Sequence, residues 1–208
     1  MIREACVEGF SQALRAQELG AERIELCENL AAGGTTPSLG TVMACKKYLK
    51  IPVIVMIRPR GGSFNYTTLE SEIMAGDIEA VKKAGADGIA VGLLTQKGEI
   101  DFAQLLKVIK WAGSMQITFH KAIDVTGNIE SEFMKLRDSG LVQRILTSGG
   151  AETALKGAQV LNRLLQLSEN KIQIVVAGKV TSKNLQELCK LIPANEFHGK
   201  KIVGTIDY

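Results

Sequence analysis

The sequence predicts a single-domain α/β protein, residues 1–208, folded as a closed (β/α)8 barrel of the TIM type. Three observations predict this fold. First, β-rich runs alternate with helical patterns along the whole chain of 208 residues. Second, a helical pattern stops at a glycine and a β-rich run begins two or three residues later, as at Gly20, Gly85 and Gly140. Third, the alternation gives eight strands, the number that closes such a barrel.

Each element has its own local signal. A glycine cap precedes the second, fourth and sixth strands, Pro52 opens the third, apolar runs mark the fifth and seventh, and the eighth is short. The expected strands are Arg3 to Val7, Arg23 to Cys27, Val53 to Ile57, Gly88 to Gly92, Gln116 to His120, Arg144 to Thr147, Gln173 to Ala177 and Glu196 to His198. The expected helices are Phe10 to Leu19, Ser38 to Leu49, Leu69 to Ala84, Asp101 to Lys110, Ile129 to Ser139, Glu152 to Leu167 and Ser182 to Leu191.

Two alternatives concern the architecture. An open doubly wound sheet is disfavoured because no Gly-x-Gly-x-x-Gly follows the first strand. Because the chain is short for a barrel, we expect the last helix to be missing or replaced by the tail from Lys200 to Tyr208.

Composition narrows the classes of function. Hydrophobic residues make up 46% of the chain, enough for one buried core. The 25 basic and 22 acidic residues form no long run of like charge, so nucleic acid and membrane surfaces are not favoured partners. The amino terminus lacks a signal-peptide pattern, which predicts a cytoplasmic protein. The four cysteines lack zinc-finger spacing and are expected to be free thiols.

Two matched tripeptides, which we call the Glu-x-Cys words, lie near the ends of the first two predicted strands: Glu4-Ala5-Cys6 and Glu25-Leu26-Cys27. Residues two apart on a strand share a face, so each word points its carboxylate and thiol the same way, into the predicted barrel. If the strands are neighbours, two thiols and two carboxylates converge at the barrel mouth. Such a cluster could bind a soft metal ion or transfer protons.

Other polar residues are expected at the same carboxyl ends, where barrel enzymes carry their active sites. The loops with Arg58, Arg60 and with Ser148-Gly149-Gly150 are expected to hold an anion through cations and bare backbone amides. Met56, Thr118 and His120 should also face the interior, with Met56 a conceivable third sulfur donor. His198, near the end of the short last strand, is interpreted as structural.

The residues also carry a resemblance that covers nearly the whole chain. The sequence resembles the CutC family of copper homeostasis proteins in Glu4-x-Cys6-Val7, Gly20-Ala21-x-Arg23-Ile24-Glu25-Leu26-Cys27, Gly33-Gly34-x-Thr36-Pro37-Ser38, Val55-Met56-Ile57-Arg58-Pro59-Arg60-Gly61-Gly62, Asp77-Ile78, Gly85-Ala86-Asp87-Gly88, Thr118-Phe119-His120-Lys121-Ala122-x-Asp124, Ile145-Leu146-Thr147-Ser148-Gly149-Gly150-Ala151 and Glu196-Phe197-His198. The resemblance implies a cytoplasmic barrel that handles copper, with Cys6 and Cys27 as the Cu(I) ligands. Three positions depart from the usual family pattern. Lys121 stands where arginine is usual, Lys179 interrupts a usually glycine-rich turn after the seventh strand, and Gly199-Lys200 follows His198 where serine or alanine is common. The second departure weakens the argument for a backbone phosphate cradle in that loop.

Two functions therefore remain open, and they can coexist. In the first, the protein binds copper as Cu(I) through Cys6 and Cys27. In the second, it is an enzyme acting on a small phosphorylated or carboxylated metabolite, in which Glu4 or Glu25 takes a proton and His120 or Lys121 stabilises the developing negative charge. The expected partner is the copper ion or this small anion, and the sequence leaves open whether the chain forms a homo-oligomer.

Overall fold

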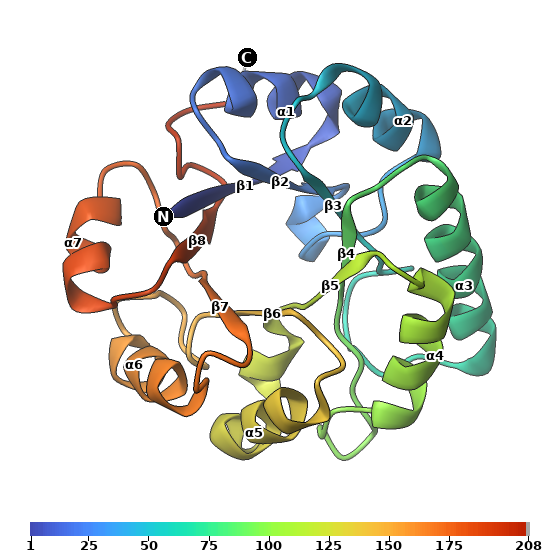
Figure 1. Ribbon diagram of the computed structural model, residues 1–208. Coiled ribbons are helices and arrows are strands. Elements are labelled where there is room, and N and C mark those ends of the chain that lie inside the picture. The colour runs from blue at the N-terminus through green and yellow to red at the C-terminus, as the bar shows by residue number, and fades with distance from the viewer. Residues whose placement is uncertain (207–208) are drawn as a thin grey trace.

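Eight parallel strands close into a barrel surrounded by helices in the computed structural model, which describes residues 1–206 (Figure 1). The strands pair in chain order and β8 pairs with β1, which confirms the predicted fold. The strands are β1 Ile2–Glu8, β2 Arg23–Cys27, β3 Val53–Met56, β4 Gly88–Val91, β5 Gln116–Phe119, β6 Arg144–Thr147, β7 Gln173–Val176 and β8 Glu196–Gly199.

Helices connect the strands on the outside of the barrel (Figure 1). They are α1 Gly9–Glu18, α2 Leu39–Tyr48, α3 Thr68–Lys83, α4 Phe102–Ala112, α5 Ile129–Ser139, α6 Ala158–Leu167 and α7 Leu185–Leu191, with short 3-10 helices η1 Leu30–Ala32 and η2 Lys121–Val125. None of the described helices has the length and apolar character needed to cross a membrane. Residues 200–206 form turns and one bridge to Thr181, so no helix follows β8 in this segment. The remainder of the predicted tail, Asp207 and Tyr208, lies outside the described residues.

The start of the sixth helix is the main correction to the predicted elements. The helix expected from Glu152 begins at Ala158, and residues 151–157 form bends and turns instead. The Ala154 amide donates to the carbonyl of Gly178 at 2.8 Å, which ties this segment to the loop after β7. At Gly157 a Cβ would lie 1.9 Å from the Ser148 carbonyl oxygen, so the segment packs too closely for any larger residue. Tertiary contacts have therefore replaced the first turns of the helix.

The two faces of the strands have different partners, as their alternation predicts. Ala5, Val7, Ile24 and Leu26 are fully buried in the apolar layer between barrel and helices. A separate small apolar cluster fills the interior near the thiols and contains Cys6, Cys27, Ile54, Met56 and Ala90. The strand register sets Cys6 opposite Glu25, so the two Glu-x-Cys words lie on neighbouring strands and face the interior.

Buried charges fill the barrel interior beneath the thiols. Arg23 is 5% exposed and pairs with both Glu4 on β1 and Glu196 on β8. On the opposite side, Arg144 Nε donates to Thr118 Oγ1 at 3.0 Å, and its Nη1 donates to Gln116. An unpaired charge in such a place would be strongly destabilising, so the two ion pairs of Arg23 help to fix how β1, β2 and β8 meet.

We expect Arg23→Met to lower the free energy of unfolding by about 3 to 5 kcal/mol, because it leaves two buried carboxylates without their cation. Urea denaturation followed by circular dichroism measures the change. Arg15→Met is the matched control, since Arg15 pairs with Glu18 at 3.1 Å on the exposed surface of α1, and such pairs contribute at most about 1 kcal/mol. Equal effects of the two substitutions would contradict the structural role given to Arg23.

Candidate metal and acid/base site

The two strand-end cysteines and Glu25 form a compact buried group at the carboxyl end of β1 and β2. The sulfur atoms of Cys6 and Cys27 and a carboxylate oxygen of Glu25 all lie within 4.8 Å of one another. The Cys27 thiol donates to Glu25 Oε2 at 3.6 Å. The other cysteines lie elsewhere, with Cys45 buried on α2 and Cys189 half-buried on α7. The structure thus brings together three of the predicted site residues in a geometry able to hold one ion.

A glycine loop covers this group. Gly33 and Gly34 follow η1 with φ values of 87° and 89°, the left-handed region that favours glycine. A Cβ on Gly34 would lie 3.5 Å from both the Cys27 sulfur and the Met56 methyl carbon. The Met56 side chain and the Cys27 thiol therefore reach the same side of the site. A cavity of about 180 Å³ at this place is lined by both thiols, Met56 and His198.

His198 links the thiols to the charged layer below them. Its Nδ1 lies 2.8 Å from Glu4 Oε1, and its Nε2 lies 3.6 Å from Glu25 Oε2. Burial disfavours the charged ring, but the Glu25 carboxylate and the hydrogen bonds with Cys6 and Glu4 raise the pKa of His198 well above its usual value. The neighbours of His198 thus favour its imidazolium form and place the ring at the candidate site, whereas the sequence interpretation gave it a structural role only. Knowledge that β8 pairs with β1 would have placed His198 beside Glu4 and Cys6.

The neighbours of the two glutamates separate their acidities. Burial would raise the pKa of Glu4, but the hydrogen bond with His198 and the charge of Arg23 lower it to about 2. Burial raises the pKa of Glu25 to about 8, helped by the charges of Cys6 and Glu4 and opposed by that of His198. At neutral pH Glu4 is therefore ionised, while Glu25 is largely protonated.

The same environment gives the two thiols different pKa values. The hydrogen bond with Cys27 lowers the pKa of Cys6 well below its usual value; burial opposes this effect and His198 adds to it. The same hydrogen bond and burial raise the pKa of Cys27 well above its usual value. These shifts favour a thiolate at Cys6 beside an imidazolium at His198. A thiolate is the form of cysteine that binds metal.

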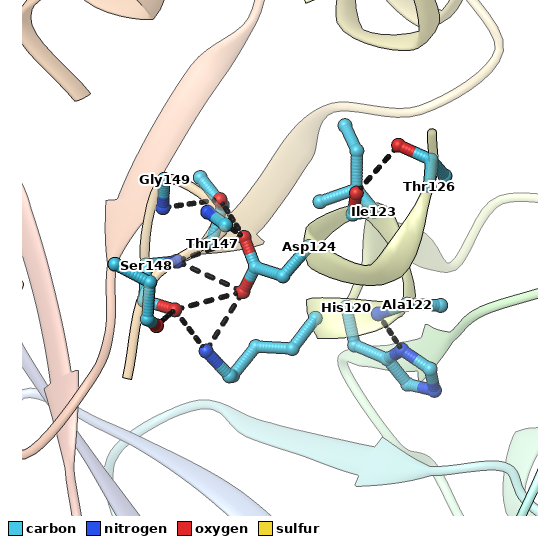
Figure 2. Close-up of polar contacts among 11 residues, drawn as sticks. His120, Ala122, Ile123, Asp124, Thr126, Thr147, Ser148 and Gly149 are labelled. Carbon is cyan, nitrogen blue, oxygen red and sulfur yellow. Dashed lines mark hydrogen bonds and ion pairs between the residues drawn. The ribbon is translucent and has the colours of Figure 1, made fainter. Parts of the chain in front are cut away.

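His120, at the end of β5, is buried as a neutral ring. Burial and the charge of Arg58 lower the pKa of His120 to about 3. Its Nδ1 accepts a hydrogen bond from the Ala122 amide at 3.1 Å (Figure 2), so the proton of the neutral ring is on Nε2. Nε2 is buried without a partner among the described residues, although His120 lines the cavity of about 180 Å³. A Cβ at Gly92 would lie 2.0 Å from the ring, so only glycine lets His120 take this position.

The two predicted anion-binding arginines mainly contact backbone carbonyls of the protein itself. Arg58 is 4% exposed, and its guanidinium donates to the carbonyls of Ala32 at 3.2 Å, Gly34 at 3.1 Å and Gly62 at 2.7 Å. Arg60 pairs with Glu70 and donates to three carbonyls of residues 61–65. Arg58 lines the cavity and fixes the covering loop, whereas Arg60 lies outside it. An anion-binding role for either arginine stays a prediction.

The predicted glycine loop after β6 surrounds an anion that belongs to the protein itself. Asp124 points from η2 toward residues 147–149 (Figure 2). Its carboxylate accepts hydrogen bonds from the amides of Ser148 and Gly150, while the Gly149 amide donates to Thr147 Oγ1 at 2.9 Å. Lys121 Nζ lies 2.7 Å from Asp124 and also contacts Ser148. These amides are therefore occupied, and a substrate role for Ser148, Gly149 and Gly150 stays a prediction.

We expect the neutral state of His120 to make the protein less stable in acid. The folded pKa of about 3 lies below the ordinary value of 6.5, so the unfolded chain binds the proton more readily and stability falls as the pH drops below 6.5. Between pH 7 and pH 5 the loss is about 2 kcal/mol. Urea denaturation at both pH values should show a shallower loss for His120→Asn, which keeps an acceptor for the Ala122 amide. An unchanged pH dependence would contradict the neutral ring.

Known proteins provide an independent comparison over the full length of the chain. The family model described as the CutC family matches residues 1–203. The copper homeostasis protein cutC homolog of Homo sapiens is 39% identical over 197 residues, which cover 95% of this chain and 72% of the human protein. A CutC family protein of Enterococcus faecalis is 41% identical over 211 residues, covering 98% of this chain and all of that protein.

Solved structures agree with this match. The crystal structure of a copper homeostasis protein CutC from Streptococcus agalactiae has a TM-score of 0.92 at 34% identity and covers 97% of this chain and 99% of that one. The aldolase QR15 has a TM-score of 0.68 at 14% identity, covering 99% of this chain and 92% of that one, and shares the fold alone. The resemblance seen in the sequence motifs is thereby confirmed, and the chain belongs to the CutC family.

Proposed function

We propose that this protein acts in the cytoplasm in copper homeostasis and binds Cu(I) between Cys6 and Cys27. The observation that carries the proposal is the convergence of both sulfur atoms with Glu25 within 4.8 Å at the barrel mouth. Metal–thiolate bonds are about 2.3 Å long, so one ion between two sulfurs requires a separation of at most about 4.6 Å. The two sulfurs lie no more than 4.8 Å apart, which is close to this limit or within it.

The chemistry of the donors favours Cu(I). Thiolates and thioethers are soft ligands that select Cu(I) over hard cytosolic cations, and Met56 lies beside Cys27 as a further sulfur. Glu25, with its pKa raised by burial to about 8, is largely uncharged and adds little attraction for a hard ion. Two thiolates with Cu(I) carry one negative charge in total, which the imidazolium of His198 would neutralise.

The relatives support the same proposal. The human and murine proteins that match this chain are named for copper homeostasis. A reducing cytosol keeps thiols free, and it is the compartment in which such a site would operate.

We expect reduced, metal-free protein to take up Cu(I) in competition with a chromogenic chelator. Cys6→Ser and Cys27→Ser should each weaken binding by more than the roughly 10- to 100-fold that follows loss of a residue that only orients a ligand. Cys189→Ser, on α7, should bind as the unmodified protein does. Retention of full affinity in either site variant would contradict a shared thiolate site.

A second candidate function rests on the opposed acidities of the two glutamates. Paired carboxyl groups whose pKa values are pushed apart, here about 2 for Glu4 and about 8 for Glu25, are typical of acid/base sites. We propose that Glu25 exchanges a proton with a small anionic metabolite in the cavity. The Nε2 proton of neutral His120 and the ammonium of Lys121, both at this cavity, would stabilise negative charge that develops on the substrate.

We expect the metal-free protein to exchange a carbon-bound hydrogen for deuterium in at least one small phosphorylated or carboxylated carbonyl compound, followed by proton NMR in D2O. Glu25→Gln should slow the exchange by about 100-fold or more, since general acid–base catalysis contributes that much. Glu22→Gln, at an exposed position, should have no effect. Absence of exchange across the panel, or exchange unaffected by Glu25→Gln, would contradict this candidate.

A further inference from the structure

A second cavity opens directly beside the thiol group. Its volume is about 570 Å³, within the usual range for small-molecule sites. The loop after β7 and the loop after β8 form most of its wall, with Val180 and Gly199 among the lining residues. We call it the lysine groove, because its charged rim is formed by Lys121, Lys179, Lys200 and Lys201.

The charge of the lysine groove is not balanced within residues 1–206. Glu152 is the only carboxylate that lines it, and it pairs with Lys179 and also with Lys156, which lies outside the groove. Lys200 and Lys201 are exposed and form no ion pair with any residue of the described part of the chain. Cations left unpaired on the wall of a cavity favour an anionic ligand.

The backbone holds one of these lysines in an unusual conformation. Gly178 and Lys179 have φ values of 104° and 55°, and a left-handed φ is uncommon for lysine. The turn is fixed by hydrogen bonds to both carbonyls, from the Ala154 amide at 2.8 Å and from Asn184 Nδ2 at 3.0 Å. These bonds therefore hold Lys179 in the turn, where it adds a cation to the rim of the groove.

We propose that the lysine groove binds the phosphate group of a small phosphomonoester. In barrels of this architecture the loops after the seventh and eighth strands frequently form a phosphate site, and these two loops form the groove. Lysine ammonium groups bind phosphate as point charges. This inference goes beyond copper handling and does not depend on it, because none of the four lysines is a metal ligand.

The position of the groove defines how the rest of the ligand lies. Cys6, Lys121, His198 and Lys200 line both this groove and the smaller cavity above the thiols. A phosphomonoester held by Lys200 and Lys201 would therefore extend its other end toward Cys6 and His198. Bound phosphate would compete with Glu152 for Lys179, so removing the charge of Glu152 strengthens binding.

Isothermal titration of reduced, metal-free protein at low ionic strength tests the proposal with three probes: inorganic phosphate, glycerol 3-phosphate and glycerol. We expect both phosphates to bind and glycerol not to bind, with glycerol 3-phosphate the tighter if the ligand is an ester rather than the free ion. The double variant Lys200→Ala with Lys201→Ala should weaken binding at least tenfold. Glu152→Gln should tighten it several-fold, and this opposite direction excludes a general loss of folding.

Lys47→Ala with Lys50→Ala is the matched control, since it removes two exposed lysines at the other end of the barrel, around the end of α2. It should change the affinity little. The proposal is overturned if neither phosphate binds at 10 mM, or if the control weakens binding as much as the groove variant does. Because no metal is present, these outcomes are independent of the Cu(I) titration.

Discussion

The Glu4 carboxylate is the contact on which the barrel and its site both depend. It pairs with Arg23 on β2 and lies 2.8 Å from His198 Nδ1 on β8, so one side chain of β1 joins the two strands that flank it. Arg23 extends this contact to Glu196. The closure of the barrel is therefore made partly of buried charge, and each charge needs its partner in place.

This same contact determines the chemistry of the thiols. With Glu4 ionised below it, His198 holds its proton, and the imidazolium then favours a thiolate at Cys6. Glu25 lies next to the same negative groups, so its carboxyl retains a proton to about pH 8. Positive and negative groups therefore alternate from the charged layer toward the barrel mouth. Arg23 is positive, Glu4 is negative, His198 favours the positive form and Cys6 favours the negative form. A binding site for a soft cation and an acid/base site both need this arrangement, which is why the two proposed functions can share it.

Local patterns in the sequence were sufficient for the fold and for the facing of the strands, because alternation and glycine caps are short-range signals. The inward position of Glu4, Cys6, Glu25 and Cys27 follows from them. The role of His198 could not be derived in that way, because it depends on the pairing of the last strand with the first. The late start of α6 has a similar origin, since the contact of Ala154 with Gly178 joins two loops that are distant along the chain.

Polar residues at the barrel mouth divide into those that hold the structure and those that remain free to act. Sequence patterns cannot distinguish structural from functional polar residues, because a carboxylate of the protein itself and a bound anionic ligand are held by the same kinds of amides and cations. Asp124 occupies the amides of the loop after β6, and Arg58 is bound to backbone carbonyls. Once these contacts are assigned, several groups that could act on a ligand lie in two adjoining places. His120 Nε2 and the thiols face the smaller cavity, and Lys200 and Lys201 face the lysine groove. The proposed copper site uses only the sulfur atoms, so a second, anionic ligand is what the remaining cations are suited to hold.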